Sequence, residues 1–322
     1  MRKPYVYITR KLPEPIVDQF RLFSEVKMWN SENLPVPREV LLEEASKADA
    51  LLTMLSDKVD QQLLSVGKNL KVIANLAVGF DNIDVIEATK RGVAVCNTPD
   101  ILTDTTADLV FSLILMTARK LVEAVDCVKS GEWKSWSPLF MAGADVHHKT
   151  IGIVGMGKIG EAVAKRALGF DMKVLYHNRN RKVEAEQTLG VTYQSFNDLV
   201  SESDFVVCLT PLTEETKGMF NKETFRKMKH AAFFINASRG AVAVEKDLVD
   251  ALKNGEIAGA GLDVFVKEPI DLDHPLLQLE NVVALPHIGS ASVETRLAMM
   301  KRCCQNIELI LNGKQPLNVL NM

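Results

Sequence analysis

Three glycines, Gly155, Gly157 and Gly160, constrain the fold of this chain more than any other feature of its sequence. They follow an apolar run at 150–154 and open a helical pattern over 158–168. In such a strand–turn–helix, the first glycine permits a tight turn, the second lets the backbone approach a pyrophosphate, and the third allows close helix packing. The helix start offers free N–H groups and a positive dipole end to phosphate. The pattern predicts a dinucleotide-binding loop made of Gly155, Met156, Gly157, Lys158, Ile159 and Gly160.

Strand and helix signals alternate along both halves of the chain, whose 322 residues are enough for about two domains. In the first hundred residues, strands are expected at 5–9, 50–53, 72–75 and 93–96. A second series has strands expected at 150–154, 173–176, 205–209, 232–236, 259–263 and 282–285, and a last helix is expected at 292–311. This order implies parallel β/α/β units in both halves and a doubly wound sheet in the second.

The segment between the two series has a different pattern. Apolar residues at helical spacing predict one long helix over 104–129, whose first half is apolar on most sides and is expected to be buried. A loop-like stretch with Trp133 and Trp136 follows, up to His148. Packing of these tryptophans on a partner subunit is the preferred interpretation, and a small local core is the alternative.

Composition excludes several classes of protein. With 47% hydrophobic and 25% charged residues, the chain has the composition of an ordinary globular protein. A net charge of −3 argues against nucleic acid as a partner. No apolar run reaches the roughly 18 to 20 residues that a membrane span needs, and the first residues lack the apolar core of a signal peptide.

The five cysteines favour a reducing, cytoplasmic compartment. Their number is odd and no two have Cys-x-x-Cys spacing, so a disulfide framework is not expected. Cys303 and Cys304 are adjacent, but neighbours on a helix point about 100° apart. A structural role on a helix is therefore preferred to metal binding for this pair, and no metal site is predicted.

The end of the second strand of the dinucleotide domain predicts the cofactor. An acidic residue about 20 residues past the glycines usually holds the ribose 2′-hydroxyl of NAD. Here that place is taken by Asn178, followed by Arg179 and Arg181. Because guanidinium groups attract a 2′-phosphate, NADP(H) is expected to be preferred over NAD(H). The alternative is that both arginines are solvated loop charges.

Three expected strand ends in the second half carry polar residues that strands do not need for packing: Arg239, Asp263 with the following Glu268, and His287. Ligands of open α/β sheets bind at the carboxyl ends of strands, so these segments are expected to face one cleft. An arginine can clamp a carboxylate and its neighbouring carbonyl. A histidine beside a carboxylate can give a proton to that carbonyl. The three types suit reduction of a 2-oxo acid.

These motifs give the chain a resemblance to the D-isomer-specific 2-hydroxyacid dehydrogenase family along nearly its whole length. The matching stretches are Gly155-x-Gly-x-x-Gly160, Asn236-x-Ser-Arg239-Gly, Gly261-Leu-Asp263-Val-Phe with Glu268-Pro, and Pro286-His287-Ile-Gly. The glyoxylate/hydroxypyruvate reductase branch is similar also in Thr103-Asp-Thr-Thr-Ala-Asp108, Gly131-x-Trp-x-Ser-Trp136-x-Pro-Leu139 and Thr295-Arg296.

The resemblance implies roles for particular residues. Catalysis would fall to Arg239, Glu268 and His287. The residues expected to contact the cofactor are the glycine loop, Asn178, Arg179, Arg181, Thr106, Thr210, Pro211, Ala237, Ser238, Asp263 and Gly289. The residues expected to contact the substrate are Leu76, Val78, Gly79, Arg239 and Ser290, with backbone N–H groups of 75–81 holding its carboxylate. Met54 and the loop from Trp136 to Leu139 are further candidates for specificity.

The resemblance also implies an architecture and a partner. A Rossmann cofactor domain at 100–286 would be inserted into a flavodoxin-like substrate domain made of 1–99 and 287–322. A homodimer would form through 104–148. The expected reaction is NAD(P)H-dependent reduction of glyoxylate or hydroxypyruvate, with hydride from nicotinamide C4 and a proton from His287. The alternatives are a D-lactate-like or 3-phosphoglycerate-like dehydrogenase, or a non-catalytic, nucleotide-sensing corepressor-like protein.

Overall fold

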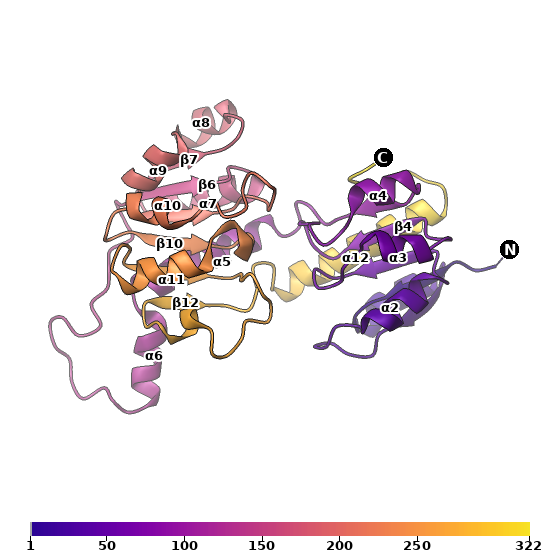
Figure 1. Ribbon diagram of the computed structural model, residues 1–322, viewed down its shortest axis with the longest axis horizontal. Coiled ribbons are helices and arrows are strands. Elements are labelled where there is room, and N and C mark those ends of the chain that lie inside the picture. The colour runs from indigo at the N-terminus through magenta and orange to yellow at the C-terminus, as the bar shows by residue number, and fades with distance from the viewer. Residues whose placement is uncertain (1) are drawn as a thin grey trace. The chain divides into compact units, whose positions relative to one another are not determined.

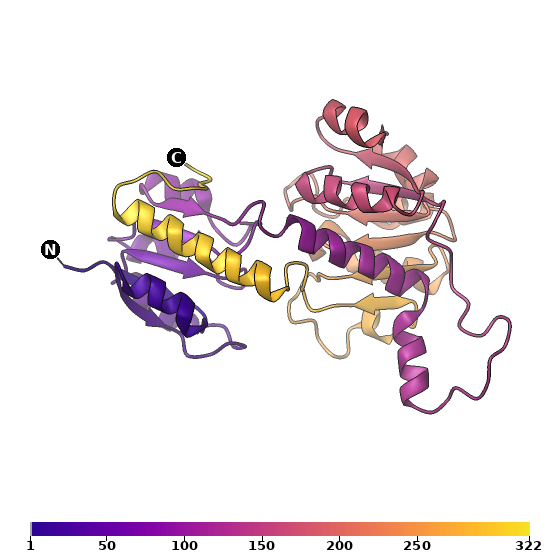
Figure 2. The same cartoon turned by 180° about the vertical axis from the view of Figure 1, so that it is seen from behind.

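The computed structural model describes residues 2–322 and divides the chain into two compact units (Figures 1 and 2). Unit 1 contains the residues up to Leu102 together with Ala291–Met322, and unit 2 contains Thr103–Ser290. Both units are built on parallel sheets, which confirms the predicted α/β fold class.

The sheet of unit 1 has five parallel strands in the order β2-β1-β3-β4-β5, the order of flavodoxin-like sheets. The strands are β1 (Tyr5–Ile8), β2 (Glu25–Met28), β3 (Ala50–Thr53), β4 (Val72–Asn75) and β5 (Ala94–Cys96). The helices are α1 (Glu14–Arg21), α2 (Arg38–Ala45), α3 (Gln61–Val66), α4 (Val85–Lys90) and α12 (Val293–Leu311). Helix α12 packs against α1 and β4, so the C-terminal segment completes this unit.

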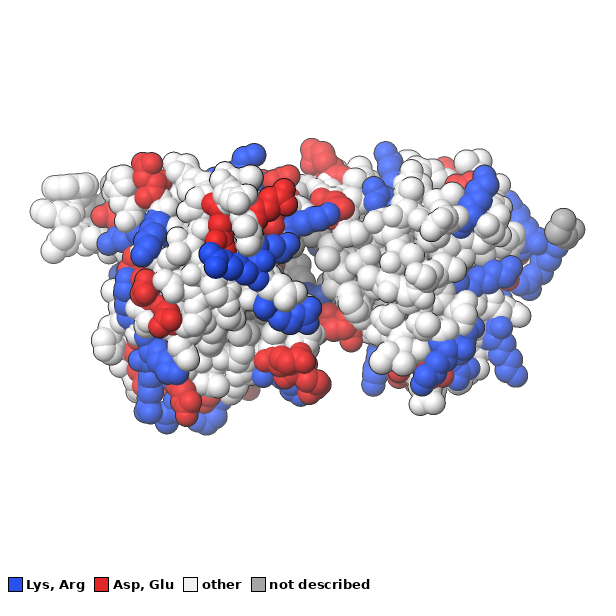
Figure 3. All heavy atoms as spheres, turned by 90° about the horizontal axis from the view of Figure 1, so that it is seen from above, with Lys and Arg blue, Asp and Glu red and all other residues white. Residues whose placement is uncertain are grey.

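The sheet of unit 2 has seven parallel strands in the order β12-β11-β10-β9-β6-β7-β8. The strands are β6 (Thr150–Val154), β7 (Lys173–His177), β8 (Thr192–Tyr193), β9 (Phe205–Cys208), β10 (Phe233–Asn236), β11 (Gly259–Leu262) and β12 (Val282–Ala284). The chain order of the strands reverses between β6 and β9, which is where ligands bind in such sheets. Acidic and basic side chains are interspersed on the face of unit 2 seen in Figure 3.

Helices cover both faces of this second sheet. On one face, α5 (Thr103–Ala118) and α7 (Lys158–Leu168) bury residues such as Leu113 and Val163 against the strands. On the other face lie α9 (Phe196–Glu202), α10 (Lys222–Lys227) and α11 (Glu245–Lys253). Helix α8 (Val183–Leu189), a 3₁₀ turn at Gly240–Val242 and another at Pro275–Gln278 complete the unit. The central strands β6, β9, β10 and β11 are therefore buried on both faces, as their apolar sequences require.

The predicted single helix over 104–129 is wrong. The structure has two helices, α5 and α6 (Leu121–Lys129), separated at Lys120, whose φ of +51° is left-handed. Helix α5 is buried as expected, with Val110 and Leu113 inaccessible to solvent. The apolar spacing continues through the break, and no glycine or proline marks it, so the periodicity alone could not reveal it.

Residues 121–148, which we call the arm, extend from the sheet of unit 2 as α6 and a long loop (Figure 2). Trp133 and Trp136 in this loop are 56% and 79% exposed. The alternative that these tryptophans form a small local core is therefore wrong for the single chain. Their exposure leaves apolar surface on the arm that the chain itself does not cover.

The five cysteines are all buried, and none of the described residues forms a disulfide. Cys303 and Cys304 lie in α12 and are almost inaccessible. Among residues 2–322, no group of three or more His, Cys, Asp or Glu side chains is arranged to hold a metal ion. None of the helices in this part of the chain is both long enough and apolar enough to cross a bilayer.

Candidate active site

The glycine loop between β6 and α7 is shaped by close backbone contacts. Gly155 has a φ of +106°, and a Cβ there would lie 2.7 Å from the carbonyl carbon of Leu209. A Cβ at Gly160 would lie 2.4 Å from the carbonyl oxygen of Gly155. Both positions therefore require glycine for the fold itself.

Gly157 differs, because a Cβ there would meet nothing within 4 Å. It is exposed and caps α7, whose first turn includes Lys158 and Ile159. Glycine at this open position lets a ligand approach the N–H groups at the start of the helix, which is what a pyrophosphate needs. Met156 is buried in the core, so only its backbone faces the loop. The residues present thus fit a dinucleotide.

The ends of β9 and β10 lie next to this loop. A Cβ at Gly155 would be 2.8 Å from the N of Thr210, just after β9. The thiol of Cys208 lies 3.6 Å from Thr210 Oγ1 and 3.3 Å from Ser238 Oγ. Ser238 also donates to Asn236 Oδ1 at 2.9 Å. The structure therefore brings together the predicted cofactor residues of three strand ends, with Pro211 and Ala237 adjacent to them in sequence.

Asp263, at the end of β11, fixes the turn after β12. Its carboxylate accepts hydrogen bonds from the N–H groups of Ile288 at 2.7 Å and Gly289 at 2.9 Å. A Cβ at Gly289 would lie 3.3 Å from Asp263 Oδ2 and 3.4 Å from Thr106 Cγ2, so Thr106 lies in the same cluster. Burial raises the pKa of Asp263, while the two N–H donors and the neighbouring His287 act to lower it.

His287 and Glu268 form the central pair of the site. Nδ1 of His287 lies 2.7 Å from Glu268 Oε2, and the two side chains are 27% and 37% exposed. The other carboxylate oxygen, Oε1, accepts from the N–H of Phe265 at 3.0 Å. Burial acts to raise the pKa of Glu268, but the bonds from His287 and Phe265 and the charge of Arg239 outweigh it, so that the pKa is lowered. Glu268 is therefore held as a carboxylate against the imidazole.

Arg239 reaches this pair because β10 and the loop after β11 are in close contact. A Cβ at Gly240 would lie 2.0 Å from the carbonyl carbon of Phe265, so only glycine permits this approach. Arg239 Nη1 donates to the Ser238 carbonyl at 2.7 Å, and Asn236 Nδ2 donates to the Arg239 carbonyl at 3.0 Å. The three predicted catalytic residues are thus gathered at the carboxyl edge of one sheet.

Two residues that the sequence analysis missed brace the loop that carries Glu268. Glu245 Oε1, in the first turn of α11, accepts from the Val266 N–H at 2.7 Å. Its other oxygen lies 3.4 Å from His274 Nε2. The sequence offered one usable signal, an acidic residue at a helix start, but nothing in it indicated the partner.

The two arginines after β7 have different surroundings. Arg181 makes a bidentate pair with Glu186, with 2.7 Å from Nε to Oε1 and 2.7 Å from Nη2 to Oε2. Tyr176 also donates to Glu186 at 2.6 Å, and these bonds lower the pKa of Glu186 to about 2. Asn178 Nδ2 donates to the Asn180 carbonyl at 3.0 Å.

Arg179 lies within electrostatic reach of the loop after β9. A side-chain hydrogen bond from Thr213 and a backbone hydrogen bond lower the pKa of Glu215, and the charge of Arg179 makes a smaller contribution in the same direction. Arg179 therefore acts on Glu215 in the loop after β9, and it does not make the bidentate pair that Arg181 makes with Glu186.

The predicted substrate residues are divided between the units. Leu76, Val78 and Gly79 follow β4 in unit 1, and Met54 follows β3 in the same unit. Ser290 is the last residue of unit 2. The roles of these residues toward a substrate stay predictions.

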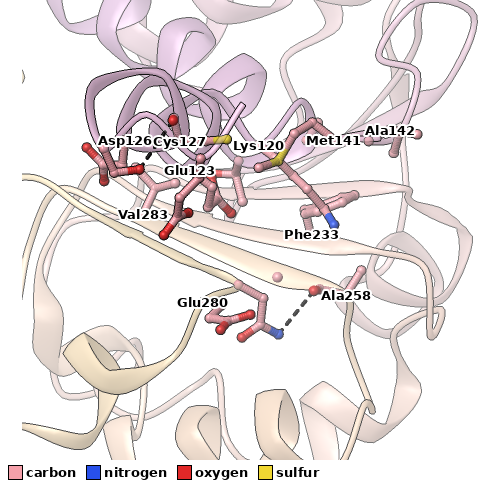
Figure 4. A pocket seen from close by; sticks show the side chains of 18 residues that line it. Lys120, Glu123, Asp126, Cys127, Met141, Ala142, Phe233, Ala258, Glu280 and Val283 are labelled. Atoms are coloured by element: carbon pink, nitrogen blue, oxygen red, sulfur yellow. Dashed lines mark hydrogen bonds between the residues drawn. The ribbon is translucent and has the colours of Figure 1, made fainter. Parts of the chain in front are cut away.

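A separate cavity of about 860 Å³ lies at the opposite end of the strands of unit 2 (Figure 4). It is bounded by the arm, through Glu123 and Cys127, and by Phe233 and Gly259, the first residues of β10 and β11. Since the catalytic candidates follow the last residues of these strands, this cavity is not the candidate active site.

Comparison with known proteins gives consistent matches over the chain. Residues 111–289 match the model of the D-isomer specific 2-hydroxyacid dehydrogenase NAD-binding domain. A glyoxylate reductase of Thermococcus kodakarensis is 49% identical over 99% of this chain and 96% of its own length. A crystal structure of a Thermus thermophilus protein superposes with a TM-score of 0.92, at 40% identity, covering 98% of this chain and 99% of that one. An NADPH-dependent glyoxylate/hydroxypyruvate reductase of Sinorhizobium meliloti, solved with NADP and malonate, gives a TM-score of 0.85 at 30% identity, covering 99% and 97%.

Proposed function

The chain belongs to the D-isomer specific 2-hydroxyacid dehydrogenase family, and on that premise we propose that it is an NADPH-preferring reductase of glyoxylate or hydroxypyruvate. The reaction reduces a 2-oxo acid to the corresponding 2-hydroxy acid. The observation that carries the proposal is the 2.7 Å contact between His287 and Glu268, with the charge of Arg239 beside it. The glyoxylate reductase activity named for the Thermococcus relative supports the substrate class.

In the proposed reaction, His287 gives a proton to the carbonyl oxygen of the substrate. Because Nδ1 faces the Glu268 carboxylate, Nε2 is the nitrogen left for the substrate. The carboxylate stabilises the charged imidazole that must carry this proton. Arg239 is proposed to bind the substrate carboxylate and to stabilise the carbonyl oxygen on which negative charge develops. When bound, the nicotinamide cofactor supplies the hydride from its C4 position.

The substrate carboxylate is further assigned to backbone N–H groups at Val78 and Gly79, with Leu76 and Ser290 as neighbouring contacts. Backbone donors suit this role because they are fixed in position before the substrate arrives. Cofactor contacts are assigned to the glycine loop, Thr106, Thr210, Pro211, Ala237, Ser238, Asp263 and Gly289.

The proposed preference for NADPH rests mainly on Arg179. No carboxylate lies among residues 178–182, directly after β7, and Asn178 stands where an acidic residue would repel a 2′-phosphate. Arg181 is already paired with Glu186, so its contribution is expected to be the smaller one. The Sinorhizobium meliloti relative is NADPH-dependent and was solved with NADP, which supports the assignment.

A homodimer through 104–148 is the proposed assembly. The apolar side chains exposed on the arm are Leu121, Val122, Val125, Val128, Trp133, Trp136, Leu139 and Phe140. Large apolar side chains exposed together on one segment mark an interaction site on a folded protein. We propose a second copy of the chain as the partner.

A cytoplasmic location is proposed from the cysteines. All five are buried and none is paired in a disulfide within the described residues, as expected of a protein from a reducing compartment.

The experiment that tests the function is a panel of 2-oxo acids assayed with NADPH and with NADH. We expect glyoxylate or hydroxypyruvate with NADPH to give the highest kcat/KM. A higher kcat/KM for pyruvate would favour a D-lactate-like enzyme, and no turnover of any 2-oxo acid would contradict the proposal.

A further inference from the structure

Three consecutive carbonyl groups after β4 accept hydrogen bonds from buried residues of unit 1, two from side chains and one from a backbone N–H. The segment 76–80, which we call the carboxylate turn, is followed by α4, then by β5, and then by Asn97 and Thr98. The hydrogen bonds to the three carbonyls are Thr98 N to Ala77 O at 2.8 Å, Asn97 Nδ2 to Val78 O at 2.9 Å, and Asn75 Nδ2 to Gly79 O at 2.9 Å. All three donor residues are buried or nearly so.

The geometry of the peptide bond then fixes where the N–H groups point. In a trans peptide, the carbonyl of one residue and the N–H of the next point in opposite directions. The described residues have only one cis peptide, at Glu268–Pro269, so the bonds of the carboxylate turn are trans. Since the carbonyls of 77, 78 and 79 face the buried side, the N–H groups of Val78, Gly79 and Phe80 face away from it. Consecutive N–H groups with one orientation form an anion-binding surface.

Asn75 is itself fixed by a buried network. Its side-chain oxygen accepts from Thr53 Oγ1 at 3.0 Å, and its Nδ2 lies 3.1 Å from Asn82 Oδ1. Asn82 Nδ2 in turn donates to the carbonyls of Met54 at 3.1 Å and Asp57 at 3.0 Å. Asn75 is inaccessible to solvent. A network of this kind gives the amide one orientation, so the carbonyl of Gly79 has a permanent inward donor.

We propose that Asn97 and Asn75 are positioning residues that preset the N–H groups of Val78, Gly79 and Phe80 for the carboxylate of the substrate. Neither side chain needs to touch the substrate, because each acts by holding a carbonyl inward. The inference rests on the proposed reduction of a 2-oxo acid and specifies how that reaction holds its carboxylate.

The test compares Asn97→Ala and Asn97→Leu, which removes the donor but keeps a side chain of similar size without adding charge, with the parent enzyme. Steady-state kinetics with glyoxylate and NADPH should show KM for glyoxylate raised about 10-fold or more. The KM for NADPH should change by less than about twofold, since the cofactor contacts lie elsewhere. Binding of oxalate, an unreactive carboxylate probe, is measured in parallel with NADP⁺ present and should weaken by the same factor.

Asn321→Ala provides the matched control. Asn321 also belongs to unit 1 and makes two side-chain hydrogen bonds to backbone, accepting from Val95 N at 2.8 Å and donating to Val93 O at 2.9 Å, away from the carboxylate turn. The melting temperature of Asn321→Ala should fall as much as that of Asn97→Ala, while its KM for glyoxylate stays at the parent value.

An unchanged KM for glyoxylate and unchanged oxalate binding in both Asn97 variants would overturn the inference, and so would an equal rise in Asn321→Ala. These results are distinct from a failure of the proposed function. If the parent binds oxalate but turns over no 2-oxo acid, the function fails, and weaker oxalate binding in Asn97→Leu would still support the positioning role. A parent that neither binds oxalate nor turns over glyoxylate would contradict both.

Discussion

His287 has a backbone conformation that most residues avoid. Its φ is +53°, in the left-handed region that costs a non-glycine residue roughly 1–2 kcal/mol. The two hydrogen bonds from Ile288 and Gly289 to Asp263 hold the turn in this conformation. Strain of this kind persists at functional sites because the surrounding structure determines it. Asp263 is therefore expected to orient the imidazole as well as to contact the cofactor.

The carboxylate of Glu268 makes a pH-dependent contribution to stability. Its pKa is lowered in the folded protein, so the stabilisation is present above the unfolded value and is lost as pH falls through the folded one. When the pH is lowered from about 7 to about 3.5, we expect the melting temperature of Glu268→Gln to fall by less than that of the parent. Thermal unfolding monitored by circular dichroism at both pH values measures the difference. Equal losses in parent and variant would contradict the pairing of Glu268 with His287.

Arginine substitutions test the proposed cofactor preference. Arg179→Ala should lower kcat/KM for NADPH by about 10- to 100-fold, the worth of a charged hydrogen bond, and leave the value for NADH nearly unchanged. Arg181→Ala should lower kcat/KM for NADPH by a smaller factor. Glu186→Gln frees Arg181 from its bidentate pair and should raise the NADPH:NADH ratio. A larger loss in Arg181→Ala than in Arg179→Ala would show that the roles are reversed.

At the residue scale, the sequence predicted which side chains matter but not which side chains they contact. The arginines were visible because they follow an expected strand. Glu186 was not recognised as a partner because it lies in the next helix, α8, where an acidic residue is ordinary. The three asparagines behind the carboxylate turn were missed for a similar reason, since buried amide networks leave no periodic pattern in sequence.

At the scale of elements, substitutions in the glycine loop can distinguish residues needed for the fold from residues needed for ligand binding. Gly157→Ala adds a Cβ that meets no protein atom within 4 Å, so the melting temperature should stay near that of the parent. NADPH binding, followed by fluorescence, should nevertheless weaken by about 10-fold or more, because the new methyl group stands where the pyrophosphate approaches.

Gly160→Ala is the matched control within the same loop. Its Cβ would lie 2.4 Å from the Gly155 carbonyl oxygen, so this variant should be destabilised, by about 1–3 kcal/mol. NADPH affinity at the parent level in Gly157→Ala would contradict the assignment of this loop to the cofactor.

Element prediction found the apolar strands, including the edge strands β5 and β12, and missed the more exposed edge strands β2 and β8. The strand β6 was expected at 150–154 and found there, because an apolar run next to a glycine turn is unambiguous. The edge strand β2 was missed, since its sequence, Glu25-Val-Lys-Met28, alternates exposed and half-buried residues. At Lys120, tertiary packing ended a helix that the apolar pattern continued.

At the scale of the whole molecule, the chain leaves unit 1 after Leu102 and returns at Ala291. The sequence predicts divisions at 99/100 and 286/287, a few residues earlier in each case. The difference arises because a motif fixes the middle of a domain, whereas the boundary depends on which core the connecting residues join. The turn of His287 to Ser290 joins unit 2 through Asp263.

The exposed apolar side chains of the arm lead to a prediction about the proposed homodimer. Val125, 49% exposed on α6, should lie in the dimer interface, so Val125→Lys should convert a dimer to a monomer in sedimentation velocity. Ile86→Lys is the matched control, because Ile86 is 72% exposed on α4 of unit 1 and outside the arm. A parent that sediments as a monomer, or a Val125→Lys variant that stays dimeric, would contradict the proposed interface.

The most direct test of the central claim is a single turnover of hydroxypyruvate with NADPH carrying deuterium at both C4 positions, for the parent and for His287→Ala. We predict glycerate of the D configuration carrying deuterium at C2, formed by the variant about 10²- to 10⁴-fold more slowly. Product without deuterium at C2, or a His287→Ala rate within tenfold of the parent, would contradict the assigned chemistry.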